Sequence, residues 1–221
     1  MIVTISQTAS NIKQTYNIDG DGFYFQGNCG RFSHFQKITL SNKNDSITGI
    51  YSMSHWVNYI PFRHLFGVAN LTRAFRLYKN DNPYGHIVFS KHGFFKSFYV
   101  IALHNGEILH CYPLSNGSFH YVSIYLGDEQ IALLETHLYV TDFKYTHKLY
   151  LLDEYNKFGE VLSFFALYYA NYRFIKRFHM SIGSFYEKSW SRSKYRYKYN
   201  EAWRETHFPN ENFFGKINLF R

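Results

Sequence analysis

VLSFFALYYA, residues 161–170, decides the fold, because nine of its ten residues are apolar or aromatic and only Ser163 interrupts them. Asp153 and Glu154 precede this run and Arg173 follows it, as suits a helix dipole, so we expect a helix over about residues 155–172 whose start the two acids cap. A surface helix keeps a polar face, which this run lacks. The sequence therefore predicts a helix surrounded on all sides, with Leu162, Phe165 and Tyr169 in the core.

Short runs of strand-forming residues, bounded by turn residues, occupy most of the chain before this helix. The runs are Ile2–Ile5, Gly22–Gln26, Phe32–Leu40, Ile47–Tyr51, Phe75–Tyr78, Gly85–Ser90, Phe98–Leu103, Glu107–Tyr112, Phe119–Leu126, Gln130–Thr136 and Lys148–Leu152. Asn105-Gly106 predicts a two-residue hairpin turn with positive φ at both residues. Asn116-Gly117 and Gly127-Asp128 predict the next corners, so the strands should form antiparallel meanders.

Length and composition fit one mainly β protein with a sizeable core. The chain has 221 residues, 21% of them aromatic, and only two cysteines, Cys29 and Cys111, which form no CxxC motif. The first residues lack the basic start and long apolar region of a signal peptide, so we expect a reducing cytoplasm. A transmembrane helix is the alternative for residues 161–170, but it needs about 18 consecutive apolar residues.

The positive charge is concentrated at the C-terminal end. Residues 173–221 hold 11 Lys and Arg against 4 Asp and Glu, which is +7 of the formal net charge of +8. We expect a barrel domain over residues 1–175 and a basic, aromatic extension over residues 176–221. Aromatic residues predict that the extension docks somewhere: Trp190, Trp203, Phe208, Phe213 and Phe214. Residues 56–71 mix both periodicities, and we expect a connecting segment there.

The order of these elements resembles a known family. Short strands, the basic aromatic hairpin SKHGFFKSFYVIALHNGEILHCY (residues 90–112) and then LYLLDEYNKFGEVLSFFALYYANYRF (residues 149–174) resemble the tubby C-terminal-like and LURP-one-related proteins. The chain is most similar to the tubby-like proteins of low-GC Gram-positive bacteria, over roughly residues 20–175. The resemblance implies a closed antiparallel β-barrel of about a dozen strands threaded by one hydrophobic helix. It also implies, by analogy, a binding role such as recognition of phosphoinositide headgroups.

The sequence offers no motif for catalysis, a metal or a cofactor, so we expect a protein that is not an enzyme and binds none. The run Asp19-Gly20-Asp21-Gly22 lacks the later ligands of a calcium loop and predicts a tight turn. His104 and His110 flank one hairpin and could face each other, although scattered histidines are the simpler interpretation. Cys111 predicts a small buried apolar residue.

The segment KSWSRSKYRYKYNEAWR, residues 188–204, is the candidate site. In an extended chain, Lys194, Arg196 and Lys198 would form a basic edge and Tyr195, Tyr197 and Tyr199 a row of rings, with Arg192 just before them. Such a segment can neutralise phosphates while its rings stack on bases or lie at headgroup depth in a membrane. The alternative is a solvated edge strand whose rings pack on the barrel and whose cations prevent aggregation.

These observations predict a non-enzymatic, tubby-like binding module that recognises an anionic ligand, such as a phosphorylated group or an anionic lipid surface. Nucleic-acid binding through the basic aromatic extension is the alternative. The expected location is the cytoplasm, with attachment at the membrane periphery if the ligand is a lipid and with no transmembrane segment. The oligomeric state and the identity of the ligand stay open.

Overall fold

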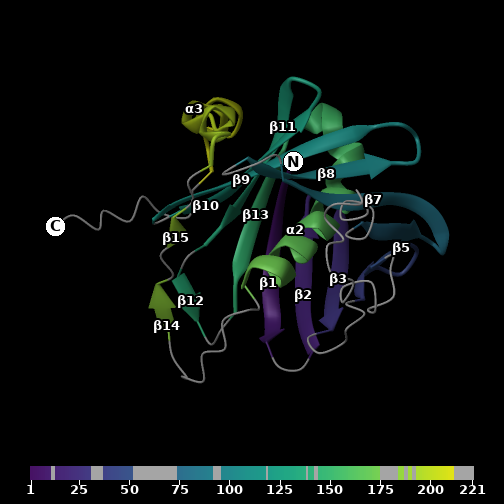
Figure 1. Ribbon diagram of the computed structural model, residues 1–221. Coiled ribbons are helices and arrows are strands. Elements are labelled where there is room, and N and C mark those ends of the chain that lie inside the picture. The colour runs from purple at the N-terminus through teal and green to yellow at the C-terminus, as the bar shows by residue number, and fades with distance from the viewer. Residues whose placement is uncertain are drawn as a thin grey trace, which may run out of the picture.

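The computed structural model describes residues 1–10, 13–30, 37–51, 74–91, 96–117, 119–137, 139–141, 144–174, 184–186, 189–190 and 193–211. Twelve antiparallel strands close into a barrel in the order β10-β11-β13-β1-β2-β3-β4-β5-β6-β7-β8-β9, and β9 pairs with β10 (Figure 1). The strands are β1 (Ile2–Ser10), β2 (Lys13–Gly20), β3 (Phe23–Gly30), β4 (Ile38–Ser41), β5 (Ser46–Tyr51), β6 (Phe75–Lys79), β7 (Asn82–Lys91), β8 (Ser97–Leu103), β9 (Ile108–Gly117), β10 (Phe119–Leu126), β11 (Glu129–Thr136) and β13 (Thr146–Leu151). The predicted fold class, a closed antiparallel barrel, is confirmed.

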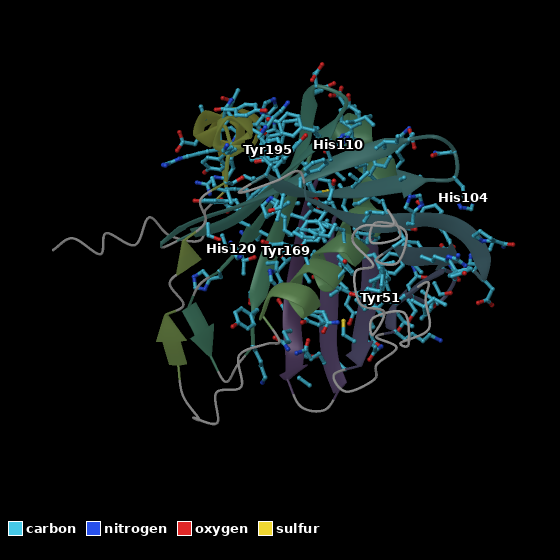
Figure 2. The ribbon with its side chains drawn as sticks, viewed as in Figure 1. Tyr51, His104, His110, His120, Tyr169 and Tyr195 are labelled. Carbon is cyan, nitrogen blue, oxygen red and sulfur yellow. The ribbon has the colours of Figure 1, made fainter. Side chains whose placement is uncertain are left out.

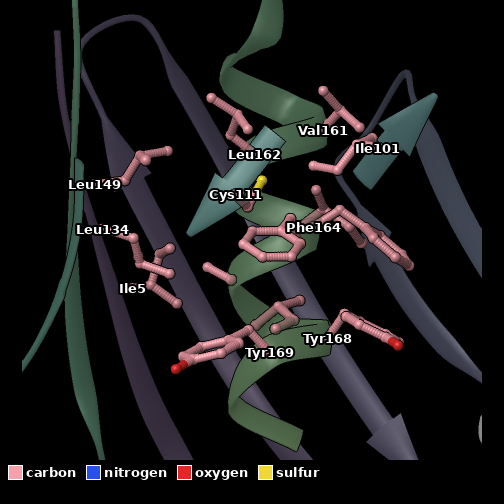
Figure 3. Close-up of a cluster of buried hydrophobic side chains, with 14 of the residues drawn as sticks. Ile5, Ile101, Cys111, Leu134, Leu149, Val161, Leu162, Phe164, Tyr168 and Tyr169 are labelled. Carbon is pink, nitrogen blue, oxygen red and sulfur yellow. The ribbon is translucent and has the colours of Figure 1, made fainter. Parts of the chain in front are cut away.

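The predicted hydrophobic helix lies in the middle of this barrel. Helix α2 (Gly159–Phe174) follows a 3-10 helix, η3 (Asp153–Phe158), and every residue from Val161 to Asn171 is buried. Figure 3 shows why: Ile5 approaches the helix from one side of the barrel and Ile101 from the other. Leu162 and Phe165 are 0% exposed and Tyr169 is 2% exposed, so their predicted place in the core is confirmed.

The start of the helix differs from the prediction. The α-helix begins at Gly159 rather than near residue 155, because the preceding six residues form the tighter 3-10 helix. The predicted capping by Asp153 and Glu154 is wrong: Leu152 is the N-cap of η3, and no side chain bonds there. The Asp153 carboxylate instead forms an ion pair with the amino group of Met1.

Glycines on the inner wall make room for the large rings of α2. A Cβ atom at Gly49 of β5 would lie 2.1 Å from Cε1 of Phe75 and 2.5 Å from Cζ of Phe164. Phe75 in turn packs against Tyr168 of α2, with ring centroids 4.9 Å apart. The barrel therefore accommodates an aromatic helix by omitting side chains where the rings meet the wall.

Turn geometry confirms one predicted corner and corrects the other two. Gly127-Asp128 connects the paired residues Leu126 and Glu129, as predicted. At the β9–β10 corner, Asn116 is still paired with Phe119, so the predicted turn residue Asn116 belongs to the strand. The β8–β9 connection is a three-residue loop rather than a two-residue turn, because Leu103 N donates to Glu107 O at 2.9 Å. Within it Gly106 has a φ of 89°, whereas Asn105 is not among the residues with positive φ.

The two-residue turn with positive φ at both positions occurs elsewhere in the structure. Asn80 and Asp81 have φ values of 49° and 64° and connect β6 to β7, where Lys79 pairs with Asn82. Asn and Asp tolerate this backbone region better than most residues. The expected turn after Asp19-Gly20 is also present, since Asp21 and Gly22 connect β2 to β3 and Gly22 has a φ of 91°.

The C-terminal extension packs against the outside of the barrel. Strand β15 (Ser189–Trp190) pairs with β9, while β14 (Ser184–Tyr186) pairs with β12 (Tyr139–Thr141). A 3-10 helix, η4 (Arg196–Lys198), and a short helix, α3 (Glu201–His207), follow, and α3 lies over the barrel wall in Figure 1. The connecting segment expected at residues 56–71, together with Phe213 and Phe214, lies outside the described residues.

Candidate functional site

The predicted site residues lie in a compact turn rather than in an extended strand. Lys194 and Tyr195 form a turn, and Arg196–Lys198 form η4, so basic and aromatic side chains do not alternate along two edges. Arg192 lies outside the described residues. We call residues 193–199 the docked segment, because their position on the barrel determines what each side chain can contact.

Two of the three predicted rings face the barrel. Tyr195 packs against Tyr112 of β9 at 5.0 Å and against Phe98 of β8 at 5.5 Å between ring centroids. Tyr199 stacks on Tyr121 of β10 with centroids 4.7 Å apart. The contacts of Tyr195 place the docked segment over β8 and β9, and Figure 2 labels Tyr195 beside His110 of β9. These two contacts fix both ends of the segment to the barrel.

The third ring and the cations face solvent. Tyr197 is 73% exposed, and Lys194 and Arg196, which precede it on the docked segment, are exposed too. Neither cation has an ion-pair partner among the described residues. The structure therefore brings together two exposed cations that pair with no carboxylate among the described residues and one exposed ring, on a segment that Tyr195 and Tyr199 hold against the barrel.

Lys198 is positioned differently from the other two cations. Its Nζ lies 4.7 Å from the centroid of Tyr125 and 5.9 Å from those of Tyr112 and Tyr197. The Tyr125 hydroxyl donates a 2.8 Å hydrogen bond to Lys198 O, which holds the backbone of η4 against β10. The sequence did not predict the roles of Tyr112 and Tyr125, although their outward positions on β9 and β10 could have been inferred from strand alternation.

Helix α3 anchors the segment on its C-terminal side. Asn200 caps α3 by accepting from Ala202 N at 3.0 Å. Trp203, 7% exposed, donates from Nε1 to Gln130 O at 3.1 Å, and Phe208 packs against Tyr150 on β13. Docking of the extension, predicted from its aromatic residues, is thus confirmed for Trp203 and Phe208.

A buried ion pair lies under α3. Arg204 contacts the carboxylate of Glu135 on β11, whose side chain is 5% exposed. Burial raises the pKa of Glu135, and the nearby Arg204 guanidinium opposes that rise. Lys148 and Glu211 form a second contact of 3.1 Å between the barrel and the extension. Arg204 therefore pairs with a barrel carboxylate and helps to dock α3, whereas Lys194 and Arg196 are exposed.

Another polar cluster lies inside the barrel. His120 Nδ1 lies 2.6 Å from Ser115 Oγ, and the Tyr169 hydroxyl lies 3.3 Å from His120 Nε2. Figure 2 labels His120 and Tyr169 close together. Thr136 Oγ1 lies 2.9 Å from Nδ1 of His147. All five side chains are buried, so this cluster lies within the core and does not form a surface site.

The remaining chemical candidates do not converge. His104 lies in the β8–β9 loop and His110 pairs with Val100, so the two histidines do not face each other (Figure 2). Among the residues that the structure describes, no group of three His, Cys, Asp or Glu could hold a metal ion. Cys111 is buried, as predicted, and burial raises the pKa of Cys29 to about 12.

A surface pocket of about 530 Å³ opens beside β3 and β4. Its walls are Tyr24, Gln26, Ser41, Asn42, Lys43 and Asn44. Lys43 is the sole cation among these residues, and five strands separate β3 from β9 in the barrel order. The pocket thus lies apart from the docked segment and offers an anion less positive charge.

Within the described part of the chain, no helix combines the length and the apolar character that crossing a membrane requires. Comparisons of the chain with protein-family models, with curated proteins and with solved structures found no match. The tubby-like resemblance therefore stays a prediction.

Proposed function

We propose that this protein is a non-enzymatic, tubby-like binding module of the cytoplasm that recognises an anionic, phosphate-bearing ligand through its docked segment. One observation carries the proposal: Lys194, Arg196 and the ring of Tyr197 are exposed on one short segment, while Tyr195 and Tyr199 of that segment pack on the barrel. Lys198 adds a third positive charge to the docked segment, and Arg192 precedes the segment in the sequence. A phosphate bound here would meet cations whose backbone is already ordered.

Preorganisation is the physical reason for favouring this surface. Binding normally costs the ordering of loops and long side chains, and a segment that is already packed avoids the backbone part of that cost. Arg presents a planar set of donors that suits phosphate oxygens, while Lys acts as a point charge. The exposed Tyr197 ring can lie against the apolar part of a ligand or at the headgroup level of a membrane.

A lipid headgroup fits this arrangement better than a nucleic acid does. Single-strand binders stack successive bases on several exposed rings. Here Tyr195 and Tyr199 are packed against Tyr112 and Tyr121, which leaves only Tyr197 for stacking among the three predicted rings. We therefore favour a phosphorylated lipid headgroup, with peripheral attachment to the membrane, and treat nucleic-acid binding as an outcome of the test.

The test compares two triple variants of equal charge change. Lys194→Gln/Arg196→Gln/Lys198→Gln removes the cations of the docked segment. Lys37→Gln/Lys43→Gln/Arg76→Gln removes three exposed cations: Lys37 just before β4, Lys43 in the β4–β5 turn and Arg76 on β6. Both proteins and the wild type are titrated with vesicles of a neutral galactolipid that lacks choline, with and without a phosphorylated phosphatidylinositol, and with a single-stranded oligonucleotide, at low and physiological salt.

The proposal expects the first triple variant to lose binding to the phosphoinositide vesicles by about tenfold or more, while the control variant binds like the wild type. Stability should change by no more than about 1 kcal/mol in either variant, because exposed charges contribute little and Lys198, although half-buried, pairs with no carboxylate among the described residues. Equal loss in the two variants would mean that net charge alone matters and would contradict a site. Preference for the oligonucleotide would support the alternative function.

A further inference from the structure

Three tyrosine rings surround the ammonium group of Lys198. Tyr125 is nearest, with its centroid 4.7 Å from Nζ, and Tyr112 and Tyr197 each lie 5.9 Å away. Tyr112 and Tyr125 meet at 77°, with centroids 5.7 Å apart, so they form two walls that are nearly perpendicular. Tyr197 contributes the third wall from the docked segment. We call these three rings the tyrosine cage.

The walls of the cage differ in how firmly they are held. Tyr112 is packed between Phe98 at 5.5 Å and Tyr195 at 5.0 Å, and Tyr125 is 8% exposed and held by its bond to Lys198 O. Tyr197 is 73% exposed and leaves one side open to solvent. The cage thus has two firmly packed walls, Tyr112 and Tyr125, and one exposed wall, Tyr197, beside which a ligand can enter.

The Lys198 ammonium group, which lies in the tyrosine cage, is only weakly stabilised there. A primary ammonium is compact and strongly hydrated, so placing it among rings removes some of its water. Within the described residues, no carboxylate pairs with Lys198 to compensate. Lys198 is held mainly by its backbone, through the Tyr125 hydroxyl, so its side chain can leave without undocking η4.

We propose that the tyrosine cage is a binding site for a quaternary ammonium group, and that Lys198 occupies it in the free protein. A trimethylammonium group carries a diffuse charge with little hydration, and aromatic cages bind such groups through the electrostatic attraction of the ring faces. His110, stacked 6.4 Å from Tyr112, adds no competing positive charge near neutral pH, since burial and the Lys198 charge lower its pKa.

The position of the cage suggests which ligand carries the ammonium. Lys194 and Arg196 lie on the same docked segment and suit a phosphate. A ligand that presents both groups a few atoms apart is a phosphocholine headgroup. This extension rests on the proposed function, whereas the cage itself depends only on the three rings and is tested without phosphate.

The experiment uses choline as the probe and its neutral isostere, 3,3-dimethyl-1-butanol, as the matched control, because the pair differs in charge but hardly in shape. Binding to the full chain is measured by calorimetry for the wild type, Lys198→Ala, Lys198→Ala/Tyr197→Ala and Lys198→Ala/Tyr197→Trp. Tyr197 is exposed, so its replacement leaves the fold intact, and circular dichroism checks this.

Removing the occupant should open the cage. We expect Lys198→Ala to bind choline roughly threefold to tenfold more tightly than the wild type, the added Tyr197→Ala to reverse that gain, and Tyr197→Trp to keep it. The neutral isostere should bind none of the proteins measurably. Equal binding of choline and the isostere, or no choline binding by Lys198→Ala, would overturn the cage proposal and leave the rings a purely structural role.

Phosphocholine separates the two proposals. In the Lys198→Ala background it should bind about tenfold more tightly than choline, and Lys194→Gln/Arg196→Gln should remove only that difference. Choline binding without any gain from the phosphate would refute the anion surface and keep the cage. Inorganic phosphate binding that depends on Lys194 and Arg196, without choline binding, would refute the cage and keep the anion surface.

Discussion

Lys79 at the end of β6 forms an ion pair of 2.5 Å with Glu160 in the first turn of α2. Two further contacts connect the start of the helical segment to the barrel rim: Lys157 pairs with Glu107 after the β8–β9 loop, and the Tyr155 hydroxyl donates to Glu129 at 2.6 Å. Partly exposed ion pairs contribute little to stability. We infer that these contacts orient the helix as it enters the barrel, and that burial supplies the stability.

Replacement of Phe165 by Ala tests the role of burial. Phe165 is 0% exposed and packs against Tyr99 of β8 with centroids 5.7 Å apart. We expect a loss of about 3–5 kcal/mol in the free energy of unfolding, because the variant loses transfer energy and leaves a cavity. Ile108→Ala on the outer surface, where Ile108 is 46% exposed, is the control and should change little. An unchanged thermal midpoint for Phe165→Ala would contradict the central helix.

Gly106→Val tests the corrected hairpin loop. Gly106 has a φ of 89°, and a Cβ added there would meet nothing within 4 Å, so any cost comes from the backbone and not from a clash. We expect a loss of roughly 1–2 kcal/mol for Val and a smaller loss for Asn, which tolerates positive φ. Denaturant unfolding measures both variants. Equal losses for Val and Asn would show that side-chain contacts, not φ, set the cost.

The sequence predicted the helix and most strands because apolar residues dominate them. It missed β2, since the inward positions there include Gln14 beside Tyr16 and Ile18, and a polar inward residue obscures the alternation. The structure explains Gln14 by a 3.0 Å hydrogen bond from the Tyr16 hydroxyl, a partner that no local pattern reveals. Buried polar residues are thus a main reason why strand prediction fails here.

The candidate site was predicted in composition but not in conformation. Alternating Lys, Arg and Tyr residues indicated an extended strand, yet Tyr195 and Tyr199 each find a ring on the barrel, and the intervening residues tighten into η4. Tyr112 and Tyr121 lie more than seventy positions earlier in the chain. Contacts over that separation depend on how the barrel closes, which single-sequence patterns do not specify.

Acid should destabilise the protein through His147. Burial, with a smaller effect of nearby His120, lowers the pKa of His147 to about 3, whereas an unfolded His titrates near pH 6.5. Below pH 6.5 the unfolded state binds a proton that the folded state excludes, so stability is full above pH 6.5 and falls as the pH decreases toward 3. Between pH 7 and pH 5 this group should cost about 2 kcal/mol.

Comparison with His147→Gln isolates that effect from the other histidines. The variant is expected to be less stable than the wild type at pH 7, but its free energy of unfolding should fall less steeply between pH 7 and pH 5. Urea unfolding at several pH values gives both slopes. Parallel slopes for the two proteins would show that His147 is protonated in the folded state and that its surroundings are more polar than the structure indicates.

The ion pair between Arg204 and Glu135 should control docking of the extension through its burial. Arg204→Met leaves the Glu135 carboxylate buried without its cation, which should cost about 3 kcal/mol or more in the docking of α3. Arg204→Met/Glu135→Leu removes both charges, and apolar side chains of similar size should recover most of that loss. Hydrogen exchange of Trp203 and its neighbours measures docking, while exchange in β1 and β2 reports the barrel as an internal control. Fast exchange at residues 201–207 in the single variant and near wild-type exchange in the double variant is the expected result. If the double variant exchanges as fast as the single one, the ion pair itself, and not the cost of an unpaired charge, holds the extension on the barrel.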